Sequence, residues 1–346
     1  MYKKWALLTF LLPLFLTGCW DKKDPEDRAF IITLGADAAE GGCRFTFAPA
    51  NIETEEPYLA ESKTLAGAVA QVDTRSSRKT DLGQLKTVIL GKELLQDSKK
   101  LDSLLGELER SRAVSEKVML LAADSAAECV ERVMKEDSGT GLFLWDFYKN
   151  TAGEVAVTRG MDLDTFLTER TEQGSVLPRI RVAEDRLQLG GGMALSANGV
   201  SLWDEAEERG YLFLLGAAEG AVPEAEDRGE SLPLCITKTK ADYAFRQAGD
   251  AILCDITLLV EGSLQGGQGI SAQRRQELEK KYNEIIKKEV EHTIKIAKTE
   301  KTDWFGILPR LRRAMPNASE SDAQLWERLA VRVSPRVEIT DMGRKR

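Results

Sequence analysis

Short apolar runs and amphipathic stretches follow one another along the first half of the chain. Residues 29–36, 87–90 and 118–122 are apolar runs of strand length, and they predict buried strands. Residues 44–48 alternate apolar and polar side chains and come directly after the turn-forming residues 37–42. The pattern therefore predicts a hairpin made of the first two strands.

Amphipathic helices are predicted between these strands. Three of them begin near a residue suited to start a helix: Thr64, Ser98 and Ser125, the last forming a capping box with Glu128. The apolar residues that recur every three or four positions in these stretches are Leu65, Ala68, Val69 and Val72; Leu101, Leu104, Leu105 and Leu108; and Cys129, Val130, Val133 and Met134. The alternation of strand and helix predicts helices layered on a sheet.

The middle of the chain has a weaker pattern. Residues 142–148 are rich in aromatic side chains, which we interpret as core or as a contact between domains. A short helix is predicted around Phe166, and residues 179–182 alternate like a strand. The glycines at 190–192 interrupt the pattern, and we predict a domain boundary there.

The second half is predicted to begin with two strands, at residues 193–196 and 211–215. An acidic segment at residues 203–208 lies between them. Residues 219–230 are acidic and contain Gly and Pro, which predicts a solvated loop.

The remaining elements are longer. Residues 252–260 alternate with period two, which is typical of an antiparallel strand buried on one face. Residues 273–299 form the longest predicted helix, with an apolar stripe and many paired charges. The last strand, residues 331–339, contains Pro335, and a residue without an amide hydrogen predicts a sheet edge or a bulge.

These elements predict an α+β fold of two or three domains, each a mostly antiparallel or mixed sheet flanked by helices. The chain is long enough for that number of domains. We assign residues 29–190 to an N-terminal α/β region, which two subdomains would fit, and residues 191–343 to a C-terminal α+β domain.

The N-terminus has the pattern of an export signal. Lys3 and Lys4 precede an apolar run at residues 5–15, and small residues follow. A helix over this segment would rise only ~21 Å, less than the ~30 Å core of a bilayer, and Pro13 would interrupt it. Residues 1–18 are therefore predicted to be a signal peptide and not a membrane span.

The signal ends at Leu16-Thr17-Gly18-Cys19, which resembles a bacterial lipobox. In such a motif the cysteine receives diacylglycerol and becomes the mature N-terminus, so Cys19 is the predicted lipidation site. Two acyl chains hold a protein at a membrane where one chain holds it only weakly. The polar residues 19–28 would be the tether; a plain secretory signal with an incidental Cys19 is the alternative.

Composition argues against nucleic acid as a partner. Without residues 1–18 the chain keeps 46 basic against 56 acidic side chains, and an acidic body gains no counterion release on binding nucleic acid. The other cysteines, Cys43, Cys129, Cys235 and Cys254, lie in apolar patterns and lack metal-ligand spacing. A Cys235–Cys254 disulfide would require their strands to pair; we favour reduced core thiols.

The sequence contains no recognisable catalytic motif. The single histidine, His292, lies in the charged long helix, where we interpret it as a surface residue. Gly91-Lys92 lacks the other residues of a phosphate-binding loop. Residues 267–272 (Gly-Gln-Gly-Ile-Ser-Ala) follow a strand that has a polar face, unlike a dinucleotide-binding strand. We predict no catalytic residues, no metal, no cofactor and no enzymatic activity.

Several blocks in order resemble the Ger(x)C-type spore-germination lipoproteins, the C subunits of germinant receptors. The blocks are Leu16-Thr17-Gly18-Cys19-Trp20-Asp21 with 27–29 and Leu34-Gly35-Ala36-Asp37; 64–68 with Arg75-Ser76-Ser77-Arg78-Lys79 and 84–91; Gly191-Gly192-Met193-Ala194 with 207–211; and Thr302-Asp303-Trp304-Phe305-Gly306 with Pro316, Trp326 and the final strand to Gly343. Gln84 and Ala36 depart from the residues usual in the family. The resemblance spans almost the whole mature chain.

The resemblance implies a lipid-anchored, non-enzymatic subunit of a nutrient receptor that acts in spore germination. It also implies α/β domains, a location on the outer face of the spore inner membrane, and two membrane-protein partners, the A and B subunits. Cys19 is the one functional residue it carries over. The alternatives are a solute-binding lipoprotein of a transporter, which would have two similar lobes, and a lipid-anchored hydrolase.

Overall fold

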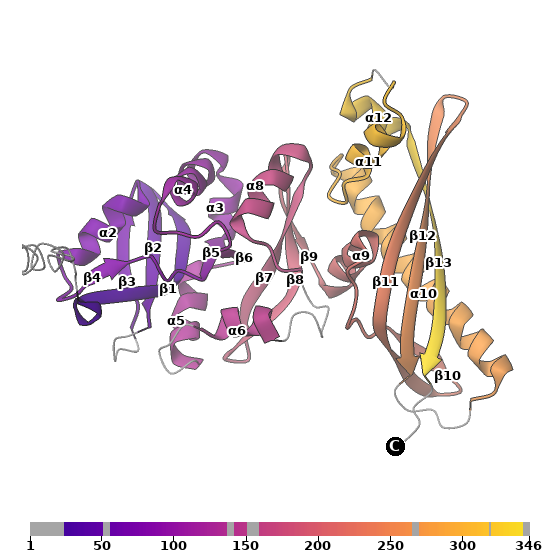
Figure 1. Cartoon of the computed structure of the whole chain (residues 1–346), viewed down its shortest axis with the longest axis horizontal. Coiled ribbons are helices and arrows are strands. Elements are labelled where there is room, and N and C mark those ends of the chain that lie inside the picture. The colour runs from indigo at the N-terminus through magenta and orange to yellow at the C-terminus, as the bar shows by residue number, and fades with distance from the viewer. Residues whose placement is uncertain are drawn as a thin grey trace, which may run out of the picture.

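The computed structural model describes residues 24–50, 56–136, 142–150, 159–264, 270–317 and 320–341. They form two units that follow each other along an elongated molecule (Figure 1). We call residues 28–203 the N-terminal unit and residues 205–341 the C-terminal unit. Each contains one sheet with helices, so the predicted α+β class is confirmed.

The N-terminal unit is built on a mixed sheet in the order β3-β2-β1-β5-β6-β7-β8-β9, with β4 paired to β1. Its strands are β1 (Arg28–Ala39), β2 (Gly42–Pro49), β3 (Tyr58–Ser62), β4 (Lys79–Asp81), β5 (Thr87–Gly91), β6 (Met119–Ala123), β7 (Ser175–Ala183), β8 (Arg186–Ser196) and β9 (Gly199–Trp203). Strands β1, β5 and β6 are parallel. The predicted hairpin of β1 and β2 is confirmed.

Helices cover both faces of this sheet. The 3-10 helix η2 (Pro25–Asp27) leads into it; α2 (Leu65–Asp73), α3 (Lys92–Gln96), α4 (Ser98–Arg110) and α8 (Leu163–Glu172) pack on one face, and α5 (Ala126–Glu136) and α6 (Phe143–Asn150) on the other. Thr64 caps α2, as predicted, by accepting a hydrogen bond from the amide of Gly67 at 3.0 Å. Helix α4 begins at Ser98, but its cap is Asp97, whose carboxylate accepts from the Lys100 amide at 3.1 Å.

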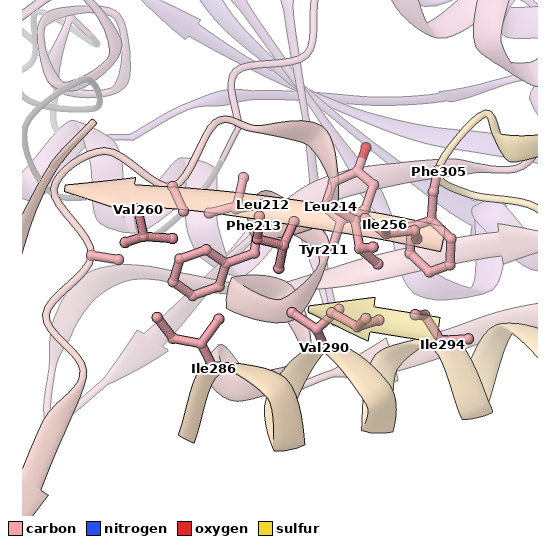
Figure 2. Close-up of a cluster of buried hydrophobic side chains, with 14 of the residues drawn as sticks. Tyr211, Leu212, Phe213, Leu214, Ile256, Val260, Ile286, Val290, Ile294 and Phe305 are labelled. Atoms are coloured by element: carbon pink, nitrogen blue, oxygen red, sulfur yellow. The ribbon is translucent and has the colours of Figure 1, made fainter. Parts of the chain in front are cut away.

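The C-terminal unit has a four-stranded sheet in the order β10-β11-β12-β13. Its elements are α9 (Glu205–Leu215), β10 (Glu224–Asp227), β11 (Glu230–Ala248), β12 (Ala251–Leu264), α10 (Ala272–Thr299), α11 (Ile307–Ala314), α12 (Asp322–Arg328) and β13 (Leu329–Asp341). The predicted alternation in β12 is confirmed, because every second side chain is buried. The α9 side chains lie between this buried side of β12 and helix α10, which contributes Ile286, Val290 and Ile294 (Figure 2).

The prediction of a strand at residues 211–215 is wrong, because this run is the second half of α9. The acidic segment before it forms the first turn, where Asp204 and Glu207 make a capping box, and Gly216 ends the helix with φ of 67°. Four consecutive residues, Tyr211 to Leu214, are buried. A helix surrounded by protein shows no polar face, so periodicity cannot distinguish it from a buried strand.

Two further expectations change. Residues 219–230 are not a wholly solvated loop: β10 pairs with β11, Ala225 is buried, and Asp227 binds Arg274 and Lys281.

The glycines at 190–192 do not end a strand, since β8 continues through them, with Gly191 at φ of 74°. The domain boundary placed there stays a prediction.

The final strand lies at a sheet edge, as predicted from Pro335. Beyond the proline, α10 closes the edge: the Asn283 side chain accepts from the Val337 amide at 2.9 Å, and Glu279 accepts from the Ile339 amide at 3.1 Å. Amides of alternate residues point to the same side of a strand, so Pro335 removes the next donor in that row. The edge is therefore poor in donors for another strand.

The four cysteines of the described chain are unpaired thiols. The β11–β12 register places Cys235 opposite Ser263 and Cys254 opposite Phe245, so pairing of the strands does not bring the two sulfurs together. Burial raises the pKa of Cys129 and of Cys254 to about 12. These two thiols are structural and unreactive at neutral pH.

Candidate functional site at the joint between the two units

The predicted lipidation site, Cys19, lies outside the described residues, as do the signal peptide and most of the tether. The described chain enters the fold through η2 and begins β1 at Arg28, which pairs with Lys79 of β4. These strands lie at the end of the N-terminal unit away from the C-terminal unit (Figure 1). In the described part of the chain, no helix is both long enough and apolar enough to cross a membrane.

The residues considered for catalysis are not brought together. His292 is on the surface of α10 with its side chain 59% exposed, and its Nε2 lies 3.5 Å from a carboxylate oxygen of Glu207. Within the described ranges, no three His, Cys, Asp or Glu side chains are arranged to hold a metal ion. Residues 267–269 of the glycine-containing turn lie outside the described residues, and Ser271 caps α10.

Two of the sequence blocks meet at the start of α5. The carboxylate of Asp37 accepts hydrogen bonds from the amides of Ala126 and Ala127, each at 2.8 Å. Gly91 leaves the space for this carboxylate, because a Cβ there would lie 2.0 Å from its oxygen. Ser125, predicted as the cap, accepts from the Glu128 amide at 3.3 Å. The blocks at residues 34–37 and 84–91 therefore anchor a helix, and the site is structural.

The block at residues 302–306 joins the two units. Trp304 is fully buried and donates from its indole Nε1 to the carbonyl of Leu195 in β8 at 2.7 Å. The amide of Gly174, just before β7, donates to the carbonyl of Asp303 at 3.1 Å. A Cβ on Gly174 would lie 2.4 Å from the Trp304 ring, so only glycine permits this approach.

The hydrophobic core is continuous across this joint. The ring of Trp203, at the end of β9, lies 5.8 Å from Tyr211 and 5.0 Å from Trp304 in edge-on contacts. Val176 and Ala194 from the N-terminal sheet belong to the same cluster as the core of α9, α10 and β12. Edge-on aromatic pairs are a favourable geometry, so the joint is a packed contact and not a loose linker.

Asp303 organises the start of α11. Its side chain is buried and accepts from the amides of Phe305 at 3.1 Å and Leu308 at 2.6 Å. Desolvation raises the pKa of Asp303, against the opposing effect of these amide donors and of Arg310. Gly306 has φ of 69°, in the left-handed region that favours glycine. The sequence Asp-Trp-Phe-Gly thus makes a sharp turn into a helix.

A cavity of about 340 Å³ opens beside this turn, between α8, the end of α9 and α11. Three arginines, Arg159, Arg310 and Arg313, line it together with Glu169 and Gln173. Its remaining wall is mostly apolar and consists of Leu215, Ala217, Phe305, Gly306 and Pro309. Both units therefore contribute side chains to the cavity.

Glu169 already has a cationic partner. Arg159 donates from Nη1 to a carboxylate oxygen of Glu169 at 2.7 Å and to the Tyr211 hydroxyl at 3.2 Å. Burial alone would lower the pKa of Arg159, but Tyr211 and Glu169 more than offset that effect, so the pKa lies above its ordinary value. Burial raises the pKa of Tyr211 to about 12. The pair is thus neutral overall and both partners are held in place.

Arg310 is also fixed, but by neutral groups. Its Nη1 donates to the carbonyls of Phe305 at 2.6 Å and Gly306 at 2.7 Å, and its guanidinium lies 4.7 Å from the centre of the Tyr243 ring. Arg313 is exposed, one turn of α11 further along. The sequence contained no signal for this arginine group, because Arg159 precedes α8 whereas Arg310 and Arg313 lie on α11, far away in the chain. The block at residues 302–306, which the sequence does indicate, lies directly beside them.

Comparison with known proteins identifies both halves of the chain. Residues 21–182 match the family model described as the spore germination protein N-terminal domain, and residues 192–343 match the C-terminal domain of the spore germination B3/GerAC-like proteins. Spore germination protein KC of Bacillus subtilis (strain 168) is 20% identical, over 93% of this chain and 90% of its own. The putative spore germination protein YfkR of the same organism is 21% identical, over 98% and 96%.

A solved structure has a similar fold. The crystal structure of the GerBC protein matches with a TM-score of 0.57 and 14% identity, covering 88% of this chain and 96% of that one. At this identity the similarity concerns the fold alone.

Proposed function

Because the chain belongs to the GerAC-like family of spore germination proteins, we propose that it is a lipid-anchored, non-enzymatic subunit of a germinant receptor. In this role diacylated Cys19 holds the body at the outer face of the spore inner membrane. The body docks with two membrane subunits of the A and B type. The single observation that carries the proposal is the pair of family matches, which begin two residues after Cys19 and extend to residue 343.

The contacts made by the family-like sequence blocks support a docking role, because they hold the body together. The named sequence blocks anchor α5 and join the two units. The tether enters at one end of an elongated molecule, so the C-terminal unit would lie farthest along the chain from the anchor (Figure 1).

Replacing Cys19 tests the anchor. We expect Cys19→Ala to leave the spore membrane fraction and to slow nutrient germination, because the acyl chains are lost. Cys235→Ser is the matched control, since it removes a half-buried thiol without touching the signal. Mass spectrometry of the wild-type N-terminal peptide should show a diacylglycerol thioether on Cys19. An unmodified thiol, or full membrane attachment of the alanine variant, would contradict the anchor.

Purification from detergent-solubilised spore membranes tests the partnership. We expect two multi-span proteins to copurify with the wild-type chain. Recovery of the chain alone under conditions that keep other membrane complexes intact would contradict membership in a receptor. The solute-binding alternative is less well supported, because it requires two similar lobes and the two sheets differ in strand number and order.

A further inference from the structure

We infer that the cavity between α8, α9 and α11 binds a small organic carboxylate. This inference goes beyond the proposed receptor role, which assigns no ligand to the body of the protein. The cavity volume of about 340 Å³ lies within the range typical of small-molecule sites, roughly 300–1,000 Å³.

The charge balance of the lining favours an anion. Among the described lining residues Glu169 is the one carboxylate, and one of its oxygens is paired with Arg159. Arg310 and Arg313 then remain as cations on the wall, and the groups that hold Arg310 are neutral carbonyls and an aromatic ring. The carboxylate of Asp303, next to the lining residue Phe305 in the chain, is directed to the amides at the start of α11. The wall therefore has an excess of positive charge toward the cavity.

The arginines are arranged for recognition of a planar anion. Among the described residues Arg310 donates hydrogen bonds only from Nη1, and a guanidinium has three further N–H donors on its other nitrogens. Its orientation is set by two carbonyls and the ring of Tyr243, so little side-chain entropy is lost when an anion binds. Arg313 lies on the same helix and supplies a second cation from the rim. A carboxylate matches the fork of donors in a guanidinium.

The apolar wall selects an organic anion over a hydrated inorganic one. The accessible part of this wall consists of Leu215, Ala217 and Pro309, because Phe305 is buried. Phosphate can pair with the arginines but has no apolar body to place against this wall. An organic acid with a small apolar body removes that surface from water, which contributes about 25 cal/mol per Å².

The location gives binding a structural consequence. The N-terminal unit contributes Arg159, Glu169 and Gln173, and the other lining residues lie at the end of α9, just after it, or in the turn and helix of α11. Gln173 also lies against Gly306, directly beside the Trp304 contact. A bound carboxylate would therefore bridge the two units and stabilise their joint.

The test uses the full chain purified in a neutral detergent, with benzoate as the probe. Benzamide, which has the same shape without the charge, and inorganic phosphate are the comparison ligands. Calorimetric titration should show benzoate binding at least tenfold more tightly than either. Arg313→Gln, an exposed position where the fold is unaffected, should weaken benzoate binding about tenfold, as expected for one charge-assisted contact. Arg336→Gln, which removes a surface charge on β13 away from the cavity, should leave it unchanged.

Several outcomes would overturn the inference. Absence of benzoate binding, or equal binding of benzamide, would remove the role of the charge. Phosphate binding as tightly as benzoate would remove the role of the apolar wall. Equal losses in Arg313→Gln and Arg336→Gln would indicate nonspecific attraction. All these measurements are made on the isolated chain, so they succeed or fail independently of membrane anchoring and receptor assembly.

Discussion

Strand β5 at the centre of the N-terminal sheet and strand β12 of the C-terminal sheet are both rich in apolar residues, but they are buried differently. All five residues of β5 are buried, because helices cover both faces of its sheet. In β12 the buried positions alternate with partly exposed ones, and Leu259 is 38% exposed. Parallel strands under helices have two buried faces, whereas a sheet with one covering layer has a solvated face.

The solvated face of the C-terminal sheet has ion pairs between its strands where the other face has packed apolar side chains. Ion pairs on it join neighbouring strands, such as Lys238 to Glu261 and Arg246 to Asp255. Exposed pairs of this type contribute little, roughly 0–1 kcal/mol each. The stability of this unit therefore comes from the face under α9 and α10. The outer face is free of any packing requirement and can vary.

The most direct test of this comparison is alanine substitution at adjacent positions. Ile89→Ala and Leu90→Ala should each lower the free energy of unfolding by about 2–5 kcal/mol, because the two side chains lie in cores on opposite faces. In β12, Leu258→Ala should cost a similar amount and Leu259→Ala less than about 0.5 kcal/mol. Urea unfolding measures all four. A large loss of unfolding free energy in Leu259→Ala, or a small loss in either β5 variant, would contradict this difference in burial.

A smaller effect is expected at the joint that couples the two units. Trp304→Phe removes the hydrogen bond to Leu195 and should cost about 1–3 kcal/mol, because a buried carbonyl loses its donor. Trp326→Phe is the matched control, since the buried Nε1 of Trp326 has no hydrogen-bond partner among the described residues. Thermal unfolding of Trp304→Phe should separate into two transitions. Equal costs for the two variants would show that the bond does not hold the units together.

The smallest effect concerns the pH dependence of the C-terminal unit. Burial lowers the pKa of Lys298 to about 8, partly opposed by Asp303, while its ammonium lies 4.2 Å from the centre of the Trp326 ring. Between pH 8 and about 10 the unfolded chain then binds more protons than the folded one, so the free energy of unfolding rises with pH.

The lysine variant isolates this contribution. Lys298→Met has no ammonium to desolvate, so wild type should gain stability relative to the variant from pH 7.5 to 9.5. The gain should be on the order of 1 kcal/mol, reduced because the group is partly exposed. Chemical denaturation across this range measures it, and the ionisation of tyrosines and cysteines, which both proteins share, cancels in the difference. A difference that stays constant or falls with pH would contradict the assignment.

Local patterns were sufficient for most elements. Thr64 caps α2, β12 alternates, the helix predicted at 273–299 is α10, and Pro335 lies in an edge strand. These features depend on residues close together in the chain, where hydrogen-bond reach and side-chain period are set by the backbone. The arginine-lined cavity was not predicted, because sequence separation carries no information about which side chains meet after folding.

The sequence by itself determined the periodicity of the strands, most helix starts and the α+β class, and its ordered blocks indicated the family. Tertiary structure alone decided that residues 211–215 are helical, because burial on every side removes the polar face that would reveal the period. It also decided that Asp37 anchors α5 and that Arg159, Arg310 and Arg313 line one cavity. These contacts join distant segments, and they exist only once the two sheets and the core between them have packed.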